Sequence, residues 1–246
     1  MRFFITFAYD GSKYHGYQKQ PKTRTVQGEL ERVLTTINNN EKVCVSASGR
    51  TDALVHALNQ KAHFDLIINI TKDKLKYALN NMLPKDIYIK QVEVVENDFH
   101  ARFNVKSKEY IYKINVGEYN PIDKDYIYQY NKNLNIEEMK KAIKYLEGTH
   151  DFKSFTKVDD ERDDYVRTIF RASITHDQNN LDIINISFLG TGFLRYMVRN
   201  MVGYLIEIGE GKHSSGDIID VLNACNRTCA GITASPEGLY LKDVFY

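Results

Sequence analysis

The chain has few cysteines, no excess of either charge and no long apolar run, and each of these absences excludes a class of protein. Its three cysteines are an odd number, and Cys225 and Cys229 do not have the spacing of paired zinc ligands. We interpret Cys44, Cys225 and Cys229 as reduced, structural thiols, which favours a cytoplasmic protein without a metal centre.

The apolar segments are too short for a membrane span or a signal peptide. No stretch has about 18 uncharged apolar residues in a row, and the apolar run near the N-terminus, RFFITFAYD, is interrupted by Asp10. We therefore expect no membrane anchor. With 246 residues, of which 43% are hydrophobic, the chain can bury a sizeable core as one large domain or two small ones.

The formal net charge of +1 excludes a protein that is coated in positive charge. If the chain binds nucleic acid, its basic residues must gather on one face, because phosphate contacts come from local clusters of Lys and Arg. Acidic residues gather at 159–164 (DDERDD), and each such run is also compatible with an ordinary solvated surface. The basic residues that gather in one loop are Lys13, Lys19, Lys22 and Arg24.

The order of the apolar periodicities predicts a mixed α+β chain. Thr25 is expected to cap the first helix, and Asn135 with Glu138 resembles a capping box ahead of a helix that should end at Gly148. We expect strands at 2–10, 42–47, 61–67, 86–95, 107–116, 168–176 and 181–188, and helices at 26–37, 74–83, 136–147, 193–208 and 217–224.

The two halves of the chain have a loosely similar order of strands and helices. This similarity predicts two α+β subdomains, residues 1–105 and 106–246, that share one large sheet. No sequence period supports an internal repeat, so the prediction depends on the order of elements alone.

The segment SASGRTDALVHALNQKAHFD, residues 46–65, places Asp52 directly behind Arg50 and Thr51. The position lies after a strand-like run and ahead of a short apolar segment. Ordinary turn chemistry explains an Asp here, because its carboxylate accepts local backbone N–H groups.

Arg199 lies near the middle of the apolar segment GFLRYMVRNMVGYLIEIG, between Val198 and Val202. A guanidinium in so apolar a helix should be partly buried, and a buried charge needs a partner. Asp52, an RNA phosphate and a surface carboxylate are the candidates that the sequence leaves open.

Several ordered blocks of sequence resemble the tRNA pseudouridine synthase A family. They extend over essentially the whole chain and are FAYDGSKYHGYQ, GRTDALVHA, FHARF, KEYIY, GTHDFKSF, GTGFLRYMVRNMVG and SPEGLYL. The resemblance implies the pseudouridine synthase fold, in which two ferredoxin-like or RRM-like subdomains share a large, mainly antiparallel sheet with a central cleft. It also implies an isomerase that detaches uracil from ribose, turns it and rejoins it through C5, with no cofactor or metal.

The resemblance assigns roles to individual residues. Asp52 matches the nucleophile, and Arg199 matches the arginine that holds its negative charge; a desolvated carboxylate needs such a cation to stay ionised. Tyr110 matches a tyrosine placed against the target base. Arg50 resembles the arginine that holds out the flipped nucleotide, and Leu239 matches an apolar residue near the uracil.

The resemblance also implies a substrate and an assembly. The family modifies uridines 38, 39 and 40 of the tRNA anticodon stem-loop and acts as a homodimer. A-form RNA offers mainly shape, phosphates and 2′-hydroxyls, so recognition by a basic surface is expected. Our candidates for phosphate contact are Lys13, Lys19, Lys22 and Arg24.

Leu54 departs from the family pattern, which has glycine at this place. Glycine there indicates a backbone of positive φ or a close approach, and a branched side chain would cost energy or force a different turn. Leu54 leaves open a catalytically weak tRNA-binding or RNA-folding protein on the same scaffold. A glycosidase-like hydrolase that uses Asp52 is a separate alternative. The hydrolase needs a second carboxylate about 5 to 10 Å from Asp52, and the next acidic residue in the chain is Asp65.

Overall fold

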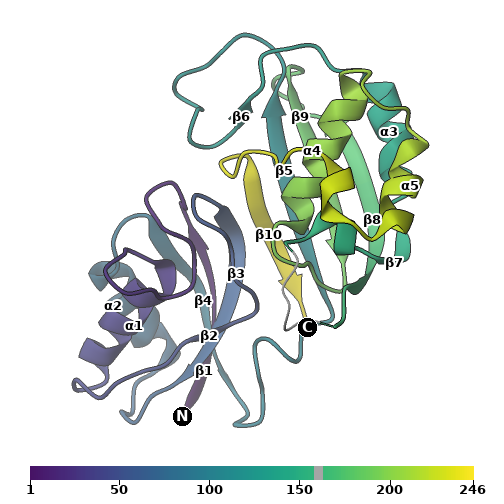
Figure 1. Ribbon diagram of the computed structural model, residues 1–246. Coiled ribbons are helices and arrows are strands. Elements are labelled where there is room, and N and C mark those ends of the chain that lie inside the picture. Colours follow the sequence, from purple (N-terminus) through teal and green to yellow (C-terminus); the bar gives the residue numbers. More distant parts are fainter. Residues whose placement is uncertain (158–162) are drawn as a thin grey trace. The chain divides into compact units, whose positions relative to one another are not determined.

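The computed structural model describes residues 1–157 and 163–246, which divide into two compact units (Figure 1). Unit 1 contains Met1–Lys106 and Tyr240–Tyr246, and unit 2 contains Ser107–Leu239. The end of the chain thus returns to unit 1, whereas the sequence placed it in the second subdomain. Most of the acidic run at 159–164 lies outside the described residues.

The sheet of unit 1 is built around its first strand. Strand β1 (Arg2–Tyr9) pairs antiparallel with β3 (His56–Asp65) and with β4 (Ile87–Val95). Strand β3 also pairs antiparallel with the short β2 (Ser46–Ala47) and parallel with β10 (Leu239–Phe245). The order β4–β1–β3–β2 is that of a ferredoxin-like sheet.

Two helices of unit 1 cover the same face of this sheet (Figure 1). Helix α1 (Val26–Ile37) is capped by Thr25, whose side chain accepts the N–H of Gly28, which confirms the predicted cap. Helix α2 (Lys72–Met82) begins two residues before its predicted start, because Thr71 caps it.

The predicted strand at 42–47 shortens to β2, and side chains of α1 explain why. The N–H of Val43 donates to Thr35 Oγ1 at 3.2 Å, and the N–H of Val45 donates to Glu31 Oε1 at 3.2 Å. These backbone groups are satisfied by a helix and not by a neighbouring strand. The prediction of a full strand here was wrong.

The sheet of unit 2 is antiparallel in the order β5–β9–β8–β7. Its strands are β5 (Ser107–Asn115), β9 (Ile183–Gly190), β8 (Val166–His176) and β7 (Gly148–Asp151). The short β6 (Tyr128–Gln129) pairs parallel with β5.

Three helices of unit 2 lie on one side of its sheet (Figure 1). They are α3 (Ile136–Lys144), α4 (Met197–Gly209) and α5 (Asp217–Ala224), and two short 3-10 helices, Lys153–Phe155 and Arg227–Ala230, accompany them. Asn135 accepts the N–H of Glu138, as predicted for the start of α3.

Two predicted helix boundaries in unit 2 were wrong. Helix α3 ends at Lys144, and Gly148, at φ +106, begins β7 instead of ending the helix. Helix α4 begins at Met197 and not at 193, because Tyr196 has φ +64 and a left-handed residue cannot continue a right-handed helix.

Both units contain helices packed on a mainly antiparallel sheet, so the predicted α+β fold class is confirmed. Across residues 1–157 and 163–246, no helix has both the length and the apolar character that a membrane crossing requires.

Candidate active site

The segment between β2 and β3, residues 48–55, is called the Asp52 loop below. Its start is tied to β3 by two buried polar residues. Ser48 donates its N–H to Lys61 O at 2.7 Å and its hydroxyl to Gln60 Oε1 at 2.6 Å. Gln60 in turn donates to Gly49 O at 3.1 Å. These bonds fix where the loop leaves the sheet.

Thr51, the residue before Asp52, is held from two sides. Its hydroxyl lies 2.8 Å from the Tyr9 hydroxyl, and its carbonyl accepts the N–H of Tyr17 at 3.1 Å. Tyr9 and Tyr17 are both buried, and burial raises the pKa of Tyr9 to about 12. The Tyr9 phenol therefore stays protonated and available for the bond to Thr51.

The segment 10–17 packs against the Asp52 loop through two glycines. A Cβ on Gly11 would lie 2.1 Å from Val55 O, and a Cβ on Gly16, which has φ +93, would lie 3.0 Å from Thr51 O. The close approach at Gly11 excludes any side chain. The two glycines in DGSKYHGY thus allow the backbones of the two segments to approach closely, which the sequence did not predict.

Leu54 adopts the left-handed conformation for which glycine is the usual residue. Its φ is +66, and the N–H of Val55 donates to Asp52 O at 3.3 Å to close the turn. Such a backbone costs a non-glycine residue about 1–2 kcal/mol. The loop therefore keeps a glycine-type turn although a branched residue occupies it, and Asp52 itself is half-buried.

His56 packs beside the loop and was missed by sequence reasoning. Its Nδ1 accepts the N–H of Gly11 at 3.0 Å, and its ring stacks on Tyr240 with centroids 4.6 Å apart. The Asp10 carboxylate also lies close to the ring, with Oδ1 3.3 Å from Nδ1.

In unit 2, Arg199 is half-buried on α4 and forms a reciprocal pair of hydrogen bonds with Ala234. Its Nε donates to Ala234 O at 2.7 Å, and its carbonyl accepts the Ala234 N–H at 3.0 Å. The guanidinium carbon lies 5.3 Å from the centre of the Tyr196 ring. These contacts set the direction of the guanidinium, as expected for a partly buried charge.

Two further residues of the motif RNMVG hold the segment 232–238 against α4. Asn200 donates to Phe155 O at 2.8 Å and accepts the Thr233 hydroxyl at 2.7 Å. A Cβ on Gly203 would lie 2.0 Å from Ile232 O. The helical periodicity indicates only that Asn200 and Gly203 lie inside a helix, so the sequence did not predict their contacts with the segment at 232–233.

Tyr110 lies on β5, opposite Phe188 of β9, and is buried. Its ring meets Phe193 edge to face, with centroids 5.0 Å apart and an interplanar angle of 75°. Leu239 begins β10, is buried, and donates its N–H to Pro236 O at 3.0 Å.

Comparison with known proteins places the chain in a family. The sequence model of the tRNA pseudouridine synthase family matches residues 5–104 and 142–246. The chain belongs to this family. Its members are isomerases that convert uridine to pseudouridine in tRNA, which confirms the family and the enzyme class predicted from the sequence.

Relatives named tRNA pseudouridine synthase A align along the whole chain. The protein of Geobacillus sp. (strain WCH70) is 46% identical in an alignment of 247 positions that covers 100% of this chain and 98% of the relative. That of Anoxybacillus flavithermus is 44% identical over 245 residues, with the same coverage. That of Limosilactobacillus reuteri is 43% identical in an alignment of 248 positions that covers 100% and 96% of the two chains. These alignments include 105–141, which contains Tyr110 and which the family model leaves unmatched.

The family motif residues are distributed over both units. Arg50, which is exposed, and Asp52 belong to one loop of unit 1. Tyr110, Arg199 and Leu239 belong to unit 2, where they lie on β5, on α4 and at the start of β10.

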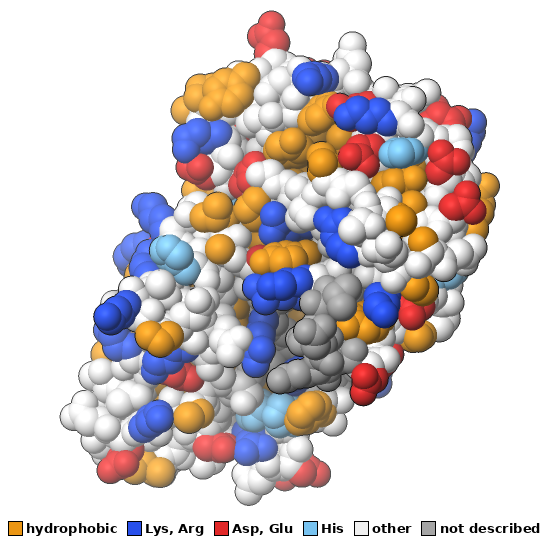
Figure 2. Space-filling model, viewed as in Figure 1, with side chains coloured by type: hydrophobic (Ala, Val, Ile, Leu, Met, Phe, Trp, Pro, Cys, Tyr) orange, Lys and Arg blue, Asp and Glu red, His pale blue; other side chains and the backbone are white. Residues whose placement is uncertain are grey.

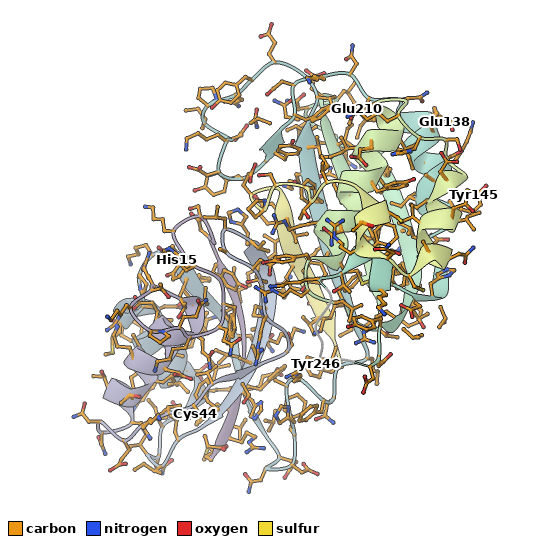
Figure 3. The ribbon with its side chains drawn as sticks, viewed as in Figure 1. His15, Cys44, Glu138, Tyr145, Glu210 and Tyr246 are labelled. Carbon is orange, nitrogen blue, oxygen red and sulfur yellow. The ribbon has the colours of Figure 1, made fainter. Side chains whose placement is uncertain are left out.

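Of the four basic residues predicted to contact RNA phosphates, two pair with carboxylates of the protein. Arg24 binds both oxygens of Asp86, at 2.9 and 3.1 Å, and Lys19 Nζ lies 3.0 Å from Glu31. Lys13 and Lys22 are exposed, and within the described residues no carboxylate pairs with either. Basic side chains gather on this part of unit 1 (Figure 2), around the position where Figure 3 labels His15.

Proposed function

We propose that this chain converts uridine to pseudouridine at positions 38, 39 and/or 40 of the tRNA anticodon stem-loop, as a homodimer in the cytoplasm. The observation that carries the proposal is the Asp52 loop, in which Ser48, Gly49 and Thr51 are held by hydrogen bonds to Gln60, Lys61, Tyr9 and Tyr17. So much fixed polar structure around one carboxylate suits a reacting group.

In the proposed reaction, the Asp52 carboxylate is the nucleophile. It forms a bond to carbon of the sugar or of the base while the bond between N1 and C1′ breaks, so that uracil separates from ribose. The base turns, C5 bonds to C1′, and the carboxylate leaves. The hydrogen on C5 departs as a proton, and N1 gains a proton in its place. The substrate and product have the same atoms, so the reaction needs no oxidant or energy donor. A carboxylate suits the task because it bonds to carbon and leaves again.

Arg199 is proposed as the ion-pair partner of Asp52. Desolvation in a closed pocket would raise the pKa of a carboxylate, and a neighbouring guanidinium opposes that rise. The fixed bond from Arg199 Nε to Ala234 O supports this role, because the remaining donors, on the two Nη groups, then have a set direction.

Tyr110, Leu239 and Arg50 are proposed to bind the flipped nucleotide. Tyr110 and Leu239 would pack against uracil, and Arg50 would hold the nucleotide out of the stem. Extrusion is necessary because C1′ and the base faces cannot be reached in a stacked helix, and it costs a few kcal/mol that binding must offset. The edge-to-face contact of Tyr110 with Phe193 supports a fixed ring at this position.

For tRNA binding we propose phosphate contacts from the basic loop, above all from Lys13 and Lys22. Lys19 and Arg24 remain in the proposed footprint, but their carboxylate partners offset part of their charge. Replacing Lys13 and Lys22 with Gln should flatten the salt dependence of tRNA affinity, because fewer counterions are released on binding.

A catalytically weak tRNA-binding protein is the alternative. It requires that Leu54 distorts the turn of the Asp52 loop. The left-handed backbone of Leu54 favours the catalytic proposal, since the turn that suits glycine is present.

The test is tritium release from an unmodified tRNA transcript whose uracil is labelled at C5, because the new bond to C1′ must expel that hydrogen. We expect release by the wild type and none by Asp52→Ala. Asp73→Asn, an exposed carboxylate on α2, is the matched control and should release tritium at the wild-type rate. Transcripts with cytidine at position 38, 39 or 40 then identify the target. Bound tRNA without release by the wild type would replace this proposal with the tRNA-binding alternative.

A further inference from the structure

Tyr196, the residue before α4, has a backbone that a bulky residue rarely adopts. Its φ is +64 and its ψ is 0, and its side chain makes no capping hydrogen bond to the helix. Left-handed geometry costs a residue with a Cβ about 1–2 kcal/mol, and such strain persists where the surroundings impose it. Glycine would remove this cost, so we look to the contacts of the ring to explain why a tyrosine occupies this position.

The Tyr196 ring contacts two guanidinium groups. The Cζ of Arg195 lies 5.0 Å from the ring centre and that of Arg199 lies 5.3 Å from it. Arg195 Nη2 also donates to the Tyr196 hydroxyl at 3.2 Å. Both separations are within the range of cation–π attraction, which is worth about 0.5–2 kcal/mol according to exposure.

The ring adds a second constraint to the Arg199 guanidinium. The bond from Nε to Ala234 O fixes one edge of the planar group, and the Tyr196 ring limits its rotation about that edge. Because the guanidinium is rigid and planar, two such contacts determine where its Nη donors point.

We propose that Tyr196 is a positioning residue, whose ring, brought into place by its left-handed backbone, holds Arg199 in the orientation that its Nη groups need to bind the reacting carboxylate. This inference rests on the role of Arg199 in the proposed function. It assigns to Tyr196 an effect on turnover through Arg199 and no contact with the substrate.

The variants Tyr196→Gly and Tyr196→Phe separate the backbone from the ring. Tyr196→Gly relieves the strain but also removes the two cation–π contacts of the ring, which are of similar size, so we expect a melting temperature close to that of the wild type. We expect its kcat to be at least 10-fold lower and its KM for tRNA to stay within twofold of the wild type. Tyr196→Phe keeps the ring and should keep kcat within threefold. A residue that only stabilises the fold would not give a lower kcat in a variant whose stability and KM are unchanged and that Tyr196→Phe restores.

Cys225→Gly is the matched control, because Cys225 is also a non-glycine residue with positive φ (+46) at a helix end of unit 2. It should raise the melting temperature without changing kcat.

A double-mutant cycle tests whether Tyr196 acts through Arg199. In the Arg199→Lys background, Tyr196→Gly should lower kcat by less than twofold further, because the group it positions is already gone. Equal losses in both backgrounds would overturn the inference, as would wild-type kcat in Tyr196→Gly.

The proposed function fails separately, if the wild type releases no tritium or if Asp52→Ala still does. In that case the role assigned to Tyr196 fails with it. Tritium release that depends on Asp52 but not on Tyr196 overturns the inference alone.

Discussion

Each unit carries one bulky residue with a left-handed backbone next to a proposed catalytic residue. Leu54 follows Asp52 by two positions at φ +66, and Tyr196 precedes Arg199 by three at φ +64. The Leu54 side chain is 40% exposed, whereas the Tyr196 ring contacts two arginines. The same backbone strain is thus only tolerated at Leu54, whereas at Tyr196 it brings a ring against the arginine that we propose it positions.

The two regions are alike in how a neighbouring segment approaches them. In unit 1 the backbone at Gly11 lies against Val55, and in unit 2 the segment at Ile232 lies against Gly203. In both places glycine permits a main-chain contact that no side chain would allow. One contact supports the loop of Asp52, and the other supports the segment that binds Arg199.

The largest expected effect comes from adding one methyl group at either contact. Gly11→Ala would place its Cβ 2.1 Å from Val55 O, and Gly203→Ala would place its Cβ 2.0 Å from Ile232 O. Backbone atoms cannot turn aside as a side chain can, so we expect each variant to lose about 3 kcal/mol in free energy of unfolding. Urea denaturation measures the loss.

The control for both variants is Gly192→Ala. The structure has nothing within 4 Å of a Cβ at Gly192, and we expect a change below about 0.5 kcal/mol. If Gly11→Ala or Gly203→Ala were as stable as Gly192→Ala, the close approach in that unit would not be a constraint.

Local chemistry explains which parts of the site could be predicted from sequence. Arg199 is a charge in an apolar helix and is conspicuous without a structure, whereas Asp52 was assigned a role only by the resemblance of its block GRTDALVHA, because turn chemistry also explains an Asp there. Asn200 and Gly203 act on residues more than 25 positions away in the chain, which periodicity cannot reveal. His56 is recognised only once the backbone of Gly11 lies beside it.

The fold shows the same division between local and distant causes. Thr25 and Asn135 cap the helices that the sequence predicted, because a cap involves neighbours in the chain. The return of residues 240–246 to unit 1, where β10 pairs parallel with β3, depends on a partner about 180 residues earlier. Tertiary context also replaced most of the strand expected at 42–47 with bonds to α1.

A second difference concerns pH, because unit 1 has a titratable histidine on β3 whose pKa is strongly lowered. Burial, followed by the charges of His100 and Arg2, lowers the pKa of His63 from 6.5 to about 4. Between these values the unfolded chain binds more protons, so this stability is complete above about pH 6.5 and is lost as pH falls toward 4. We expect a loss on the order of 2 kcal/mol, measured by urea denaturation across that range.

His63→Asn should flatten this pH dependence. Its side-chain oxygen can still accept the Ala101 N–H that His63 Nδ1 accepts at 3.1 Å, but it does not titrate. His15→Asn, at an exposed position, is the control and should leave the curve unchanged. An equal pH dependence in His63→Asn and the wild type would assign the acid sensitivity to other groups, such as Asp65, whose pKa the Arg2 guanidinium lowers.

The smallest expected effect tests the claim that Leu54 is tolerated strain. Leu54→Gly removes a left-handed cost of about 1–2 kcal/mol and adds about 0.5–1 kcal/mol of unfolded-state entropy, so we expect a net gain of roughly 0.5–1 kcal/mol. Leu58 is equally exposed, at 39% against 40%, but lies in strand β3. Leu58→Gly should therefore lose about 0.5–1 kcal/mol, since glycine weakens a strand. The two substitutions are chemically identical, and only the backbone conformation gives their effects opposite signs. If both variants were destabilised alike in urea, the Leu54 side chain would be contributing contacts that outweigh its strain, and the contrast with Tyr196 would disappear.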